Sequence, residues 1–129
     1  MRVLGLAIGV VTVLAAHAAV ADARFEKSLL RLAPSERLEQ LCDYTAMINI
    51  RKDARHFRPD RAVANATSDV RHKNHTIVAK GGAFRSRGKW YALSYTCTAE
   101  PNHLKVESFS YKIGKEIPQS KWAAYGLWR

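Results

Sequence analysis

The apolar residues between positions 23 and 51 recur at helical spacing. The first group predicts a short amphipathic helix over about residues 23–32, and it consists of Phe25, Leu29, Leu30 and Leu32. A second helix is predicted from Pro34, which suits the first helical position, to Arg51. Its buried stripe is expected to contain Leu38, Leu41, Cys42, Thr45 and Ile48.

From residue 61 onward the apolar period changes to two, which is typical of strands. Gly81-Gly82 indicates a bulge, and Arg87-Gly88 indicates a hairpin turn. The predicted strands cover residues 61–67, 76–86, 89–98 and 103–113.

The last strand and the tail have signals of their own. The apolar phase slips between Val106 and Phe109, which indicates a second bulge. Pro118 begins a short helix that is expected to end at Gly126. Together the elements predict an α+β fold, with N-terminal helices packed on an antiparallel β-meander of three to four strands and a short C-terminal helix.

Residues 1–21 have the pattern of a secretory signal peptide. A positive start is followed by an uncharged apolar run over residues 3–16 and then by small residues. Ala-x-Ala sites place the cleavage after Ala18, Ala21 or Ala23. We expect residues 22–129 to be one α+β domain, periplasmic or secreted, without a membrane span after cleavage. The apolar run is shorter than the roughly 20 residues of a transmembrane helix, and an uncleaved N-terminal anchor is the alternative.

The chain contains two cysteines, Cys42 and Cys97. Cys42 lies on the apolar stripe of the second helix, and Cys97 shares one strand face with Tyr91, Leu93 and Tyr95. A helix laid across an antiparallel sheet brings both residues to the core, and an exported protein forms disulfides in an oxidising compartment. We therefore predict a structural disulfide between them. A catalytic thiol is the alternative, but neither cysteine belongs to a Cys-x-x-Cys motif.

Positive charge is the strongest functional signal. The 129 residues contain 21 Lys and Arg against 11 Asp and Glu, a formal net charge of +10. Eleven of the basic residues but only three of the acidic ones lie between positions 51 and 89. This asymmetry creates a field that attracts anions, although a solvated surface kept for solubility is the alternative. The anion-binding candidates are Arg85, Arg87 and Lys89 at the hairpin, and Arg55, Arg58 and Arg61 after the second helix.

Enzyme motifs are missing from the sequence. It contains no G-x-S-x-G, no H-E-x-x-H and no phosphate-binding loop. His72 and His75 could approach one metal ion, but no third ligand follows at an obvious spacing, so we interpret them as solvated loop residues. We expect no catalytic residue, no metal ligand and no cofactor.

Several segments of the chain resemble one protein family. They are LEQLCDYTAM (38–47), GAFRSRGKWYALSYTC (82–97), FSYKIG (109–114), EIP (116–118) and YGLW (125–128). On these segments, residues 25–128 are similar to a rhizobial and alphaproteobacterial family of exported proteins that is known only as a domain of unknown function, number 930. The resemblance implies export and this fold, but it brings no activity and no catalytic residues. Ala33 departs from the family pattern, which has Asp there, so we expect a weaker helix cap.

These observations favour a non-catalytic protein of the cell envelope that binds an anionic component through its basic hairpin region. The candidate partners are lipopolysaccharide, a lipid headgroup, an acidic glycan or an acidic protein. Nucleic acid fits the charge but not the signal peptide, so it is not expected as a partner. The alternative is a small hydrolase of envelope polymer whose site no motif reveals. A cleft with a converging His and carboxylate would favour the hydrolase, whereas a basic face would favour binding.

Overall fold

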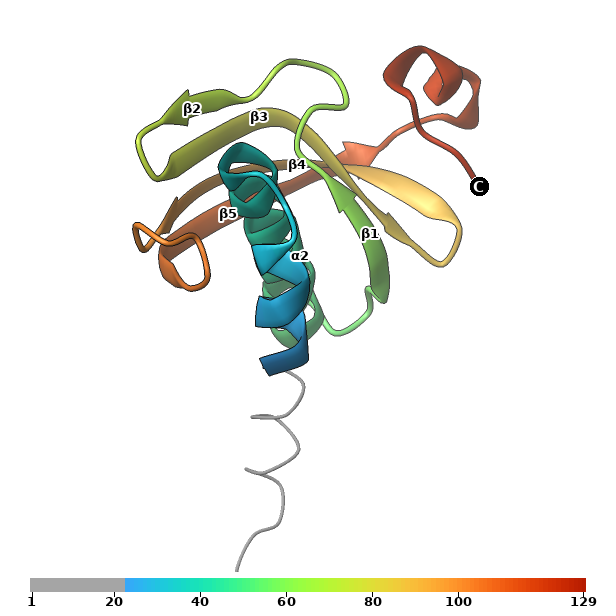
Figure 1. Cartoon of the computed structure of the whole chain (residues 1–129). Helices are drawn as coiled ribbons and strands as arrows, with labels where there is room; N and C mark the ends of the chain where they lie inside the picture. Colours follow the sequence, from blue (N-terminus) through green and yellow to red (C-terminus); the bar gives the residue numbers. More distant parts are fainter. Residues whose placement is uncertain (1–22) are drawn as a thin grey trace, which may run out of the picture.

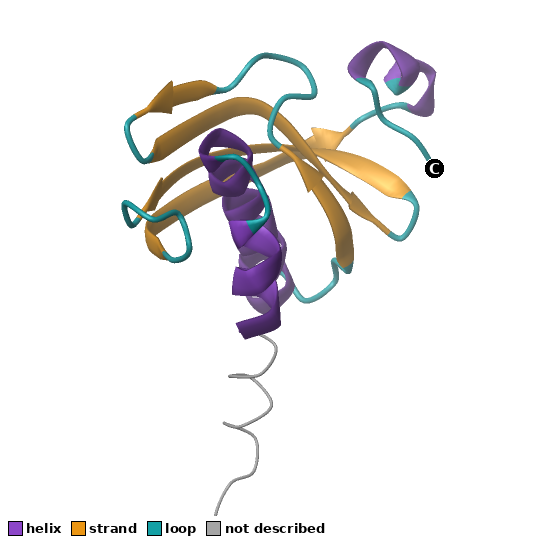
Figure 2. Cartoon of the chain, in the orientation of Figure 1, coloured by secondary structure: helices purple, strands orange, loops and turns teal. Residues whose placement is uncertain are grey.

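The computed structural model describes residues 23–129, and the predicted signal peptide lies outside them (Figure 1). A helix over residues 23–30 precedes a longer helix, five strands and two 3-10 turns (Figure 2). These elements are α2 (Pro34–Asp53), β1 (Pro59–Val63), β2 (Arg71–Lys73), β3 (Thr76–Ser86), β4 (Lys89–Ala99), β5 (Val106–Glu116), η1 (Gln119–Lys121) and η2 (Ala123–Tyr125). Within this range, no helix has the length and apolar character to span a membrane.

The strands form one antiparallel sheet in the order β1-β3-β4-β5. β1 pairs with the end of β3 that leads into the hairpin, where Pro59 faces Ser86. β2 pairs with the beginning of β3, where Arg71 faces Val78. The predicted α+β class is confirmed, whereas the short β2 was not predicted, since three exposed polar residues carry no apolar alternation.

The bulge and the hairpin turn are both confirmed. The register of β3 against β4 shifts between Ala79 and Gly82. The 66–68 loop packs on this bulge, because the N–H groups of Ala66 and Thr67 both donate to the Gly81 carbonyl at 2.8 Å. Arg87 and Gly88 have φ angles of 52° and 75°, as a two-residue hairpin turn requires.

The main core lies between α2 and one face of the sheet. Its sheet side includes Ile77, Phe84, Leu93 and Tyr95. Cys42 and Cys97 form the predicted disulfide, with their Cα atoms 6.0 Å apart. The bond therefore joins the helix covalently to the sheet.

The buried stripe of α2 differs in part from the prediction. It contains Leu38, Leu41, Cys42, Ala46 and Ile50. Ile48, expected to be buried, is 45% exposed, and Thr45 is only half-buried. Apart from Leu41, the stripe follows a row of residues four apart, because α2 lies across the sheet at an angle and Thr45 and Ile48 fall to one side of the contact (Figure 1). Ala33 is the N-cap and makes no side-chain hydrogen bond, in line with the weaker cap expected there.

A second apolar cluster covers one end of the opposite face of the sheet. It is formed by Ala83, Trp90, Ile117, Trp122 and Leu127. The Trp122 indole N–H donates to the Ile117 carbonyl at 2.9 Å, and the Trp90 indole N–H donates to the Trp128 carbonyl at 2.7 Å. The predicted last helix is instead the pair of 3-10 turns η1 and η2, which end at Gly126 in the left-handed region. We call the sheet face opposite α2 the open face, because this cluster covers only one end of it.

The last strand begins later than predicted. β5 starts at Val106, and a register shift beside Val106 confirms the second bulge. His103 lies before it in a loop, with a φ of 59° and a buried ring. Its Nδ1–H donates to the Pro34 carbonyl at 2.9 Å, and its Nε2 and Nδ1 of His75 share a hydrogen bond, also of 2.9 Å. These bonds tie the β4–β5 loop to the start of α2.

Candidate anion-binding cleft

A cleft lies between the β3–β4 hairpin turn and the C-terminal 3-10 turns. Its volume is about 560 Å³. We call it the hairpin cleft, and its lining residues are Asp60, Arg85, Arg87, Gly88, Lys89, Glu116, Gln119, Trp122 and Arg129. The three cations predicted at the hairpin therefore meet in one hollow, together with a fourth from the tail.

Arg85 forms the inner wall of the hairpin cleft. Its Nε and Nη2 atoms donate to Oδ1 and Oδ2 of Asp60, both at 2.9 Å. Its guanidinium carbon lies 5.9 Å from the ring centroids of Trp90 and Trp128, and its side chain is 12% exposed. Arg85 holds the pKa of Asp60 below its ordinary value through this hydrogen bond, while Asp60 raises the pKa of Arg85. Arg85 is thus a paired residue that supports the cleft, and its charge is largely compensated.

The other basic side chains are freer. Arg87 projects from the turn and, within residues 23–129, forms no ion pair. Lys89 lies 3.7 Å from Glu116, and the two side chains are 62% and 49% exposed. Such an exposed pair contributes little, so Lys89 remains available to a ligand. Arg129 donates to the side-chain oxygen of Gln119 at 3.2 and 2.8 Å in the favourable orientation of that amide.

The candidates after α2 lie outside the lining of the hairpin cleft. Arg61 faces Arg85 across the β1–β3 pair, and its Nη1 donates to the Asp60 carbonyl at 2.8 Å. Arg58 is held near the hairpin, because its backbone N–H donates to Ser86 Oγ at 2.8 Å. Its guanidinium turns back to the Arg55 carbonyl at 3.2 Å. Arg61 thus extends the basic surface beside the cleft, and Arg55 and Arg58 belong to a separate loop at the same end of the sheet.

The charges of the hairpin cleft favour an anionic ligand. Four basic side chains face two carboxylates, and one of these, Asp60, is already bound to Arg85. Arginine guanidinium groups form paired, charge-assisted hydrogen bonds with phosphate or carboxylate oxygens. Trp122 at the edge of the lining adds an apolar surface. The arrangement can therefore bind an anion, and none of these groups is placed as a nucleophile beside a base.

A second group of ionisable residues connects α2 with the sheet. His72 Nε2 lies 2.9 Å from Glu39 Oε1, and the Tyr95 hydroxyl donates to Asp43 Oδ1 at 2.8 Å. The pKa of Asp43 is raised to about 7, chiefly by burial; the Tyr95 hydrogen bond opposes the shift, and the nearby charge of Glu39 adds to it. Burial likewise raises the pKa of Tyr95.

This second group lies outside the hairpin cleft. Glu39, Asp43 and His72 are not among the lining residues of that cleft. His75 contacts His103 rather than His72, so the two histidines that could have approached one metal ion have different partners.

Comparison with known proteins identifies the family. The model of the Domain of Unknown Function family DUF930 matches residues 29–127, which includes α2, the whole sheet and both 3-10 turns. The chain belongs to this family. No curated protein and no solved structure matches it. The DUF930 match therefore confirms the family resemblance and brings no activity with it.

The amino-acid sequence of this chain indicated the cations of the hairpin, but it did not indicate the other residues that line the hairpin cleft. Asp60, Gln119 and Arg129 come from segments far apart in sequence, and only the fold of the tail over Trp90 brings Gln119 and Arg129 to the hairpin. Pro118, Gly126 and the aromatic residues of the tail do indicate a closing element, but they do not specify that it lies beside the hairpin.

Proposed function

We propose that this domain is a non-catalytic protein of the bacterial cell envelope, periplasmic or secreted, that binds an anionic envelope component in the hairpin cleft. The convergence of Arg87, Lys89 and Arg129 on one hollow carries the proposal. The signal-like N-terminus and the disulfide support the compartment, because disulfides persist in oxidising environments.

The fixed Arg85–Asp60 pair also supports the proposal. Because Asp60 is occupied by two hydrogen bonds, it does not compete for Arg87 or Lys89. Exposed cations bind anions through a field that salt screens, with a Debye length of about 8 Å at physiological ionic strength and about 3 Å at 1 M. Binding should therefore weaken steeply as salt is added.

The test is a binding titration with three anionic probes: lipopolysaccharide, phosphatidylglycerol vesicles and dextran sulfate. The variant Arg87→Glu/Lys89→Glu should bind the preferred probe about tenfold or more weakly, which corresponds to about 1.4 kcal/mol. The control is Lys27→Glu/Lys105→Glu, which makes the same charge change on two exposed lysines outside the cleft lining. Equal weakening in both variants would show a general charge effect, and no binding of any probe would contradict the proposal.

A small hydrolase of envelope polymer is the alternative function, and the contact between His72 and Glu39 is the observation that favours it. The protein would then release soluble fragments from purified envelope polymer, and His72→Ala would abolish the release. A parent protein that releases nothing would remove this alternative without affecting the binding proposal.

A further inference from the structure

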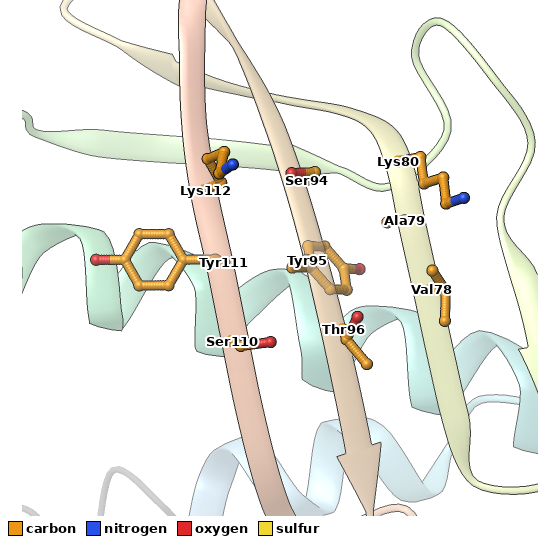
Figure 3. Close-up of a pocket in the computed structure, with 9 residues that line it drawn as sticks. All are labelled: Val78, Ala79, Lys80, Ser94, Tyr95, Thr96, Ser110, Tyr111 and Lys112. Atoms are coloured by element: carbon orange, nitrogen blue, oxygen red, sulfur yellow. The ribbon is translucent and has the colours of Figure 1, made fainter.

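The uncovered part of the open face contains a second hollow, of about 310 Å³ (Figure 3). Its side chains come from β3, β4 and β5 and alternate with those that point to the α2 side. They are Val78, Lys80, Ser94, Thr96, Ser110 and Lys112. We call this surface the open-face hollow.

The side chains of the open-face hollow form two rows across the strands. Figure 3 shows Lys112, Ser94 and Lys80 in one row and Ser110, Thr96 and Val78 in the next. The register agrees, because Ser94 faces Lys112 and Thr96 faces both Val78 and Ser110. Neighbouring strands are roughly 4.8 Å apart, so the backbones of β3 and β5 that carry the two lysines lie roughly 10 Å apart on either side of β4.

The polar groups of these rows are not used by the fold. The three ion pairs within residues 23–129 include neither Lys80 nor Lys112. Farther along the same face, Thr76 and Thr98 bond to each other at 2.8 Å, whereas the hydroxyls of Ser94, Thr96 and Ser110 form no side-chain hydrogen bond in the described part of the chain. The hollow therefore presents two cations and three hydroxyls to a ligand.

This combination fits an acidic polysaccharide. Lys80 on β3 and Lys112 on β5 lie on either side of β4, so the hollow presents two separate positive charges, which suits charges repeated along a polymer. Hydroxyl side chains can both donate to and accept from the hydroxyls of a sugar. Among the six side chains that project from the open face into the hollow, Val78 is the apolar one and the other five carry a charge or a hydroxyl.

The open-face hollow and the hairpin cleft lie on the same side of the sheet. On β4, Trp90 beneath the C-terminal cluster and Ser94 in the hollow both point to this side. They are four positions apart, which is roughly 13 Å along a strand. A ligand that reaches both sites must therefore be an extended molecule such as a polymer.

We propose that the open-face hollow is a second subsite for an acidic polysaccharide whose first charges bind in the hairpin cleft. This inference rests on the proposed function and specifies its ligand class. Linking two weak subsites through one polymer raises the effective concentration at the second, so affinity should increase with chain length.

The experiment is calorimetric titration of the full protein with oligogalacturonates of increasing length and with dextran sulfate, using neutral dextran as the blank polymer. The variant Lys80→Glu/Lys112→Glu should lose about tenfold affinity for the long acidic polymers and bind the shortest oligomer as the parent does. Thr96→Val and Ser110→Ala should each cost about threefold if the hydroxyls contact sugar. The control remains Lys27→Glu/Lys105→Glu, and matched thermal melts establish that each variant folds.

The outcomes separate this inference from the proposed function. If long and short acidic polymers bind alike and the open-face variant behaves as the control, the second subsite is wrong and the hairpin cleft stands. If phosphatidylglycerol vesicles or lipopolysaccharide bind but neither acidic polymer does, the polysaccharide assignment is wrong and anion binding stands. If neutral dextran binds equally well, charge is not the basis of recognition and both proposals fail.

Discussion

The face of the sheet beneath α2 buries Ile77, Phe84 and Leu93 almost completely, whereas the open face buries a small apolar cluster at one end and presents lysines and hydroxyls elsewhere. Both faces belong to the same three long strands, and alternation of side chains separates them. The α2 face is also joined to the helix by a disulfide. The contrast indicates that one face maintains the fold and that the other is available for binding.

Among the changes that test this contrast, removal of the disulfide should have the largest effect on stability. The variant Cys42→Ala/Cys97→Ala should lose about 4 kcal/mol of unfolding free energy, because the bond closes a loop with a sequence separation of 55. Denaturant unfolding of parent and variant measures the loss. Reduction of the disulfide in the parent should cause the same loss of unfolding free energy. Equal denaturant midpoints for parent and variant would show that packing alone holds the helix.

Two neighbouring residues of β3 point to opposite faces of the sheet, so substitutions at these positions compare the two faces directly. Ile77 is fully buried beneath α2 and Val78 is half-buried on the open face. Ile77→Ala should cost about 3 kcal/mol, because it leaves a cavity in the packed core, and Val78→Ala should cost less than about 1 kcal/mol. Similar losses in thermal unfolding would contradict the unequal roles of the faces.

Asp43 should make the α2 side sensitive to pH. Burial raises its folded pKa to about 7 from an ordinary value near 4, so its contribution to stability is fully present below pH 4 and is lost as the pH rises through 7. Asp43→Asn removes the charge, and at pH 8 it should stabilise the protein by about 4 kcal/mol relative to its effect at pH 4, because each unit of pKa shift corresponds to about 1.4 kcal/mol.

Unfolding free energies of parent and Asp43→Asn at pH 4 and pH 8 measure this difference directly. The comparison reports on Asp43, because the substitution replaces this one carboxyl group with an amide of the same shape. If parent and variant differ in unfolding free energy by the same amount at pH 4 and at pH 8, the folded-state pKa of Asp43 is not raised.

A substitution in the C-terminal cluster on the open face should have a smaller effect on the free energy of unfolding. Trp122→Phe keeps an aromatic ring but removes the N–H that donates to the Ile117 carbonyl, which should cost about 1.5 kcal/mol. The same variant should weaken anion binding, because η1 and Arg129 would lose their fixed position beside the hairpin. Thermal unfolding and a dextran sulfate titration measure the two effects. Loss of stability with unchanged affinity would separate the tail from the binding site.

Local signals allowed much of the fold to be predicted. Strand β3, its bulge and the Arg87-Gly88 turn follow from residues within about a dozen positions, and the disulfide follows from two apolar periodicities. Ile48 was placed wrongly because helical spacing gives a stripe but not the angle at which the helix crosses its sheet. β2 left no local signal because its pairing with β3 supplies the order that its own sequence lacks.

The binding surfaces were predictable only in part. The hairpin cations were visible in the sequence, but the pairing of Arg85 with Asp60 depends on β1 lying beside β3. The open-face rows were present as the alternate polar positions of β4, and only the register of β3 and β5 places Lys80 and Lys112 on either side of Ser94. Long-range pairing, which spacing along the chain does not specify, decides both sites.

Nuclear magnetic resonance mapping of the isotope-labelled protein with dextran sulfate tests the division between the two faces most directly. We expect the largest amide shifts at Arg87, Gly88 and Lys89, followed by the Trp122 indole and the Ser94 and Lys112 amides, and we expect added salt to reverse them. Amides of α2 such as Ala46 should stay unchanged. Shifts centred on α2, or no shifts at low salt, would contradict the account.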